Sequence, residues 1–153
     1  MEFDTISPAV EEILESMWAT DPADGRFPRD SWPHGCCEFA AVVLAAALED
    51  AGLGQWTFVS AGESGDVGHA WLEWRTADGV TLYSIDVTIH QFHEWDEPFI
   101  GEGVTPAVEK FSPVRYAGPL WEWPYLGDDS QIFWKLIRAV REELGRRRSD
   151  LAQ

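Results

Sequence analysis

The chain has 153 residues, of which 45% are hydrophobic, so it is long enough to form a single domain, residues 1–153, with a real core. Its formal net charge of −16 argues against nucleic acid or an anionic membrane as a partner, because phosphate groups are bound by basic patches. Two adjacent cysteines cannot build a disulfide framework, and the sequence shows neither a secretory signal pattern nor an apolar run of membrane-spanning length. We therefore expect a cytoplasmic protein.

The first predicted element is an N-terminal helix. Ser7-Pro8 is typical of a helix start, and apolar residues then recur at helical spacing up to Met17. Residues 20–33 contain three prolines and several acidic residues, which predicts a loop. From Cys36 to Leu48 the chain is rich in helix-forming residues, so a second helix is expected to start at the cysteines.

Three strands are predicted after this helix. Residues 55–60 form the first, and residues 67–74 and 81–88 form two more that are rich in aromatic and branched side chains. The turn-forming sequence Ala77-Asp78-Gly79 lies between the last two, so they are expected to pair as an antiparallel hairpin.

The remainder of the chain is predicted to be mostly loops followed by one helix. Five prolines and several glycines interrupt residues 97–129, where we expect one strand near residues 114–116. Ser130 can cap a last helix whose apolar residues recur at helical spacing between 132 and 144. The basic residues 146–148 would then lie at its C-terminal end, where cations complement the helix dipole.

Three residues in this pattern have the order of a catalytic triad: Cys36 at a helix start, then His69 and Asp86 on neighbouring strands. The start of a helix favours the thiolate, which is the nucleophilic form of cysteine. Antiparallel neighbours can place a histidine and a carboxylate on one face of a sheet, where the carboxylate orients the imidazole. We therefore predict Cys36, His69 and Asp86 as catalytic residues.

These residues resemble the transglutaminase-like branch of the papain-like cysteine enzymes. The resemblance covers residues 34–92 and is carried by Gly35-Cys36-Cys37-Glu38-Phe39-Ala40, by Gly68-His69-Ala70-Trp71-Leu72-Glu73 and by Ile85-Asp86-Val87-Thr88. It implies an α+β fold in which the helix that carries the cysteine packs on an antiparallel sheet that carries the histidine and the aspartate, with terminal helices flanking this core. It also implies that the cysteine attacks an amide or acyl carbon, that the histidine acts as acid and base, and that the aspartate orients it. Gln91-Phe92, which follows the strand that carries Asp86, is similar to what small bacterial members of the family have at this position.

Two features depart from the family pattern. The expected Gly-x-Cys is shifted by one residue, so aligning Gly35 nominates Cys37 instead of Cys36. The first glutamine of the chain is Gln55, so none precedes the cysteines to donate to an oxyanion. Backbone N–H groups at the helix start or a side chain such as Trp32 would have to do so.

A metal site is the competing chemical interpretation. Several residues are of types that bind zinc: His34, Cys36, Cys37, His90, His93 and Glu94. However, neither a Cys-x-x-Cys pair nor a His-Glu-x-x-His motif occurs. The sequence therefore predicts a site with no metal and no cofactor.

Taken together, the sequence predicts a cysteine-dependent enzyme that acts on an amide bond of a peptide or protein, as a peptidase, amidase, glutamine deamidase or transglutaminase-like enzyme. The alternative is a non-catalytic acidic protein, inhibitor-like or antitoxin-like, that covers a basic protein partner, since the net charge is −16. The aromatic segment Trp121-Glu122-Trp123-Pro124-Tyr125 is expected either to pack in the core or to stack on a peptide side chain or a sugar.

Overall fold

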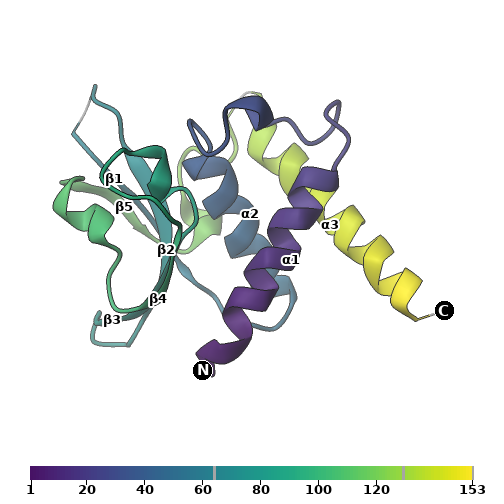
Figure 1. Ribbon diagram of the computed structural model, residues 1–153, viewed down its shortest axis with the longest axis horizontal. Coiled ribbons are helices and arrows are strands. Elements are labelled where there is room, and N and C mark those ends of the chain that lie inside the picture. Colours follow the sequence, from purple (N-terminus) through teal and green to yellow (C-terminus); the bar gives the residue numbers. More distant parts are fainter. Residues whose placement is uncertain (64, 129, 153) are drawn as a thin grey trace.

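Three α-helices and one five-stranded antiparallel sheet form the described part of the chain, residues 1–63, 65–128 and 130–152, in a computed structural model (Figure 1). The helices are α1 (Ile6–Ala19), α2 (Cys37–Asp50) and α3 (Ile132–Leu151). The strands are β1 (Thr57–Ala61), β2 (His69–Arg75), β3 (Thr81–Asp86), β4 (Phe99–Glu102) and β5 (Val114–Gly118). The chain is therefore an α+β protein, as the sequence predicts.

The sheet has the strand order β4-β3-β2-β1-β5, and every neighbouring pair is antiparallel. Strands β2 and β3 form the predicted hairpin, in which Leu72 pairs with Ile85 and Glu73 with Ser84. Gly79 takes a positive φ of 86° in the connecting turn, a conformation that glycine adopts without a steric penalty. The hairpin lies inside the sheet, with neighbours on both sides, and the first five residues of β2 and the last four of β3 are buried.

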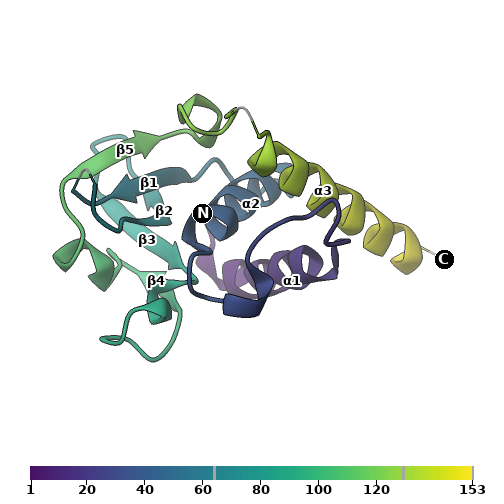
Figure 2. The ribbon, with the colours of Figure 1, turned by 90° about the horizontal axis from the view of Figure 1, so that it is seen from above.

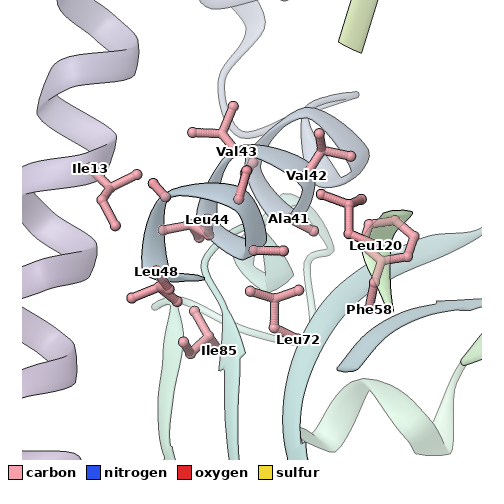
Figure 3. Close-up of a cluster of buried hydrophobic side chains, with 14 of the residues drawn as sticks. Ile13, Ala41, Val42, Val43, Leu44, Leu48, Phe58, Leu72, Ile85 and Leu120 are labelled. Carbon is pink, nitrogen blue, oxygen red and sulfur yellow. The ribbon is translucent and has the colours of Figure 1, made fainter. Parts of the chain in front are cut away.

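Helix α2 lies between the sheet and the other two helices (Figures 1 and 2). All its residues from Ala40 to Leu48 are buried, which explains why this segment is apolar on every side rather than along one stripe. Figure 3 shows Leu44 and Leu48 of α2 among core side chains, including Ile13 of α1 and Ile85 of β3. Among the described residues, no helix has both the length and the apolar character that a membrane crossing requires.

The structure differs from the predicted elements at several places. Helix α1 begins at Ile6, before the predicted start at Ser7-Pro8, and the N-cap residue of α3 is Gln131 rather than Ser130. Strand β4 was not predicted, because it has four residues between Pro98 and Gly103 and owes its extended form to pairing with the edge of β3. Helix α2 begins at Cys37 rather than Cys36, which is the N-cap residue with φ −106° and ψ 2°. This shift of one residue determines which of the two thiols faces the sheet.

Candidate active site

A buried hydrogen bond joins His69, the first residue of β2, to Asp86, the last residue of β3. The His69 Nε2 atom lies 2.7 Å from Asp86 Oδ1, and both side chains are fully enclosed. The second carboxylate oxygen, Oδ2, accepts a hydrogen bond of 2.8 Å from the Thr105 hydroxyl. The aspartate is thus held by partners on both oxygens, as a buried carboxylate requires.

The other ring nitrogen of His69 faces Gln91. Its Nδ1 atom lies 3.4 Å from Gln91 Nε2, while Gln91 Oε1 accepts from the backbone N–H of Gly35 at 3.3 Å. Because an amide nitrogen only donates, Nδ1 is the accepting nitrogen and Nε2 carries the proton that is donated to Asp86. This tautomer leaves a basic lone pair on Nδ1, on the side of the ring away from the carboxylate.

Aromatic rings surround the imidazole of His69. Its centroid lies 5.1 Å from that of Phe92, 5.3 Å from Phe111 and 5.7 Å from Trp71. Phe111 and Trp71 belong to a second cluster of buried apolar side chains, separate from the cluster around α2. These rings keep water from the His69–Asp86 pair, and electrostatic interactions are stronger in such a low-dielectric environment.

The structure brings Cys37, and not Cys36, to this histidine. A small cavity of about 80 Å³ is lined by Cys37 and His69 together with Glu38, Ser60, Gly68 and Arg115. The Cys36 side chain is instead fully buried in the core around α2, with its Sγ 3.5 Å from the carbonyl oxygens of Pro28 and His34. Of the two thiols, Cys37 rather than the predicted Cys36 therefore shares a cavity with His69.

The different surroundings of the two cysteine side chains have a local cause. Gly35 takes a positive φ of 73° directly before the N-cap residue Cys36, and Cys37 is the first helical residue. Successive side chains at the start of a helix point in directions about 100° apart. When one of two adjacent cysteines faces the core, the other must therefore point elsewhere, here into the cavity with His69.

Burial of the thiols outweighs the effect of the helix start on their acidity. Burial raises the pKa of Cys37 to about 12, and the neighbouring Glu38 carboxylate adds to the increase. Backbone hydrogen bonds from Ala70 and Glu38 lower the pKa of Cys37, but by less than burial raises it. Burial also raises the pKa of Cys36 to about 11. These raised pKa values disagree with the expectation of a resting thiolate and favour the neutral thiol at both positions.

We expect Cys37 in the native protein to react slowly with iodoacetamide at pH 8, about a thousandfold more slowly than in the urea-unfolded chain, because the thiolate fraction falls tenfold per pKa unit. The native rate should rise tenfold per pH unit from pH 7 to 9, as measured by mass spectrometry of the Cys37 peptide. A plateau near pH 6 would contradict the raised pKa of Cys37. Since both thiols have a higher pKa folded than unfolded, the free energy of unfolding should fall as pH rises from 9 towards 12.

Two residues of the site were not predicted as site residues. Thr105 lies in a loop far along the chain, and only folding brings it to Asp86. Gln91 follows the strand that carries Asp86 and lies in the short 3₁₀ helix Ile89–Gln91. Its position shortly after Asp86 is the feature of the sequence that could have indicated a place in the site. Trp32, considered as an oxyanion donor, instead packs edge-on against Trp18 with ring centroids 5.8 Å apart.

The described part of the chain shows no geometry that matches the zinc interpretation. Within residues 1–63, 65–128 and 130–152, no three His, Cys, Asp or Glu side chains are grouped so that they could hold a metal ion. Among the predicted ligands, Cys36 is enclosed in the core, and Glu94 forms an ion pair of 2.6 Å with Lys110. The residues that were considered as ligands therefore lie in different surroundings.

Comparisons with protein-family models, curated proteins and solved structures gave no match. The fold and the site thus define the class of this protein: an α+β chain in which a buried histidine–aspartate pair on a sheet shares a cavity with a thiol at a helix start. Its function is inferred below from that geometry.

Proposed function

We propose that this protein is a cysteine-dependent enzyme that transfers the acyl group of a peptide or protein amide, with a papain-like, transglutaminase-like core. Cys37 would be the nucleophile, His69 the general base and acid, and Asp86 the residue that orients His69. The observation that carries this proposal is the 2.7 Å bond from His69 Nε2 to Asp86, which leaves Nδ1 as the basic nitrogen of a histidine that lines a cavity with Cys37. The Gln91 amide, which donates to Nδ1 at 3.4 Å, would have to move aside for the thiol.

The reaction would begin with a neutral thiol, since the pKa of Cys37 is about 12. As Cys37 Sγ bonds to the carbonyl carbon, its proton moves to His69 Nδ1, and the resulting imidazolium is stabilised by the Asp86 carboxylate. His69 then gives this proton to the leaving nitrogen, the C–N bond breaks and a thioester remains. In the second half His69 takes a proton from the acceptor, which attacks the thioester and releases Cys37.

The acceptor decides which reaction results. Water would make the protein a peptidase, an amidase or a glutamine deamidase, whereas a primary amine would make it a transglutaminase-like transferase. Backbone N–H groups near the sulfur, those of Glu38 and Ala70, are the candidates for oxyanion donors, because both lower the pKa of Cys37 by stabilising negative charge there.

The proposal is tested with glutamine-containing peptides, with and without added methylamine. We expect ammonia release, together with a peptide mass change of hydrolysis or of amine incorporation, from the wild-type protein but not from His69→Gln. Glutamine keeps a polar side chain at this position but cannot act as a base. A loss of activity in the His69→Gln protein would therefore show that proton transfer by His69 is needed. If neither ammonia nor a changed peptide appears across a panel of amides, the enzyme proposal fails.

Two observations suit a different function, that of a non-catalytic acidic binding protein. The raised pKa of Cys37 and the complete enclosure of the His69 side chain also suit a purely structural core. In that case a basic protein partner should bind with an affinity that weakens steeply with salt, and replacing Cys37 should leave this binding unchanged.

A further inference from the structure

A larger cavity of about 520 Å³ adjoins the cavity of the Cys37 thiol. The two cavities share Glu38, Ser60 and Arg115 in their walls. This volume lies within the range of sites that hold small ligands or single side chains, about 300–1,000 Å³. A substrate held at Cys37 would therefore have space for a neighbouring side chain in the second cavity.

The two charged residues of the shared wall, Arg115 and Glu38, differ in their hydrogen bonding. Arg115 Nε donates to the carbonyl oxygen of Gly62 at 2.7 Å, and its Nη2 donates to the carbonyl oxygens of Glu63 and Asp66. Glu38 is half-buried, and within the described ranges no side chain or backbone group donates a hydrogen bond to its carboxylate. Nor do Glu38 and Arg115 form an ion pair within 4.0 Å there. The carboxylate of Glu38 thus has its acceptors left for a ligand, whereas Arg115 is held against loop carbonyl oxygens through Nε and Nη2.

Aromatic side chains also line this cavity. Trp123 is almost fully buried, whereas Tyr125 is 68% exposed, and their ring centroids lie 5.9 Å apart. Tyr116 of β5 is a third aromatic residue of the wall. Aromatic faces attract cations, and the net charge of −16 raises the concentration of cations near the whole surface. A cavity lined by aromatic rings and by a carboxylate with free acceptors is chemically suited to an ammonium or guanidinium group.

We propose that this cavity, defined by Glu38, Tyr116, Trp123 and Tyr125, binds the lysine or arginine side chain of the residue next to the reacting amide. This assignment rests on the proposed function, since the reacting amide is the one held at Cys37. It makes the preferred substrate a basic peptide and makes Glu38 the residue that determines this preference. The segment 121–125 thereby combines both roles expected for it, because Trp123 packs in the core and Tyr125 faces the ligand.

The test measures binding in Cys37→Ala protein, so that no turnover is needed. The probes are acetyl-Gln-Arg-amide and acetyl-Gln-citrulline-amide, which differ in the charge of otherwise similar side chains. In nuclear magnetic resonance titrations we expect the arginine peptide to bind about tenfold more tightly, as a charged hydrogen-bond partner implies, with shifts of the Trp123 indole signal. Adding Glu38→Gln should abolish this difference. Adding Glu142→Gln, an equal charge change on the exposed face of α3, should preserve it.

Either of two results would overturn the assignment: equal affinity for the two peptides, or a preference for arginine that survives Glu38→Gln. Neither result depends on catalysis. Absence of turnover by the wild-type protein together with a Glu38-dependent preference would instead reject the chemical proposal and retain the binding site. Turnover without that preference would do the reverse.

Discussion

Replacing Cys37 by alanine should abolish amide turnover, whereas replacing Cys36 by alanine should leave turnover nearly unchanged. Cys37 lines the cavity with His69, and alanine there removes the sulfur that would bond to the carbonyl carbon. Cys36 is enclosed in the core, so its replacement should instead lower the free energy of unfolding, by about 1–2 kcal/mol, through lost burial and a small void.

Each variant serves as the control for the other. Ammonia release from a glutamine peptide measures turnover, and urea unfolding followed by circular dichroism measures stability. Both variants must show the wild-type far-ultraviolet spectrum for the comparison to hold. Full activity in Cys37→Ala with loss in Cys36→Ala would return the nucleophile to Cys36, against the geometry described here.

Replacing Asp86 by asparagine should lower kcat by about 10³–10⁴-fold, the scale of losses seen when the carboxylate of such a triad becomes an amide. The amide cannot stabilise the imidazolium that forms when His69 takes the Cys37 proton. If it turns its NH₂ group towards His69 Nε2, it also forces the ring proton onto Nδ1, where the base is needed and where Gln91 already donates.

Thr105→Val is the matched control for this prediction. It removes the 2.8 Å hydrogen bond to Asp86 Oδ2 but keeps the carboxylate charge. We expect it to destabilise the fold by about 1–3 kcal/mol, because one oxygen of a buried carboxylate loses its partner, with a much smaller effect on kcat. An Asp86→Asn protein that turns over amides as fast as Thr105→Val would show that the charge of Asp86 has no role.

Much of the fold could be predicted because its strongest patterns are local. The hairpin of β2 and β3 is indicated by branched and aromatic residues on both sides of a turn sequence, and the pairing of Glu73 with Ser84 agrees with it. Helix α2 is indicated by a run of helix formers. Strand β4 could not be predicted in the same way, because four residues carry too little pattern and depend on the edge of β3.

For the site, the sequence by itself determined the residue types and their elements: a thiol at a helix start, His69 on one strand and Asp86 on the next. These follow from local composition, which the chain carries without reference to distant contacts. Tertiary structure decided that Cys37 rather than Cys36 shares a cavity with His69, that Gln91 and Thr105 lie at hydrogen-bonding distance from the His69–Asp86 pair, and that burial raises the pKa of the thiol. The physical reason is that side-chain direction, hydrogen-bond partners from distant loops and burial all depend on how the helix and the sheet pack together.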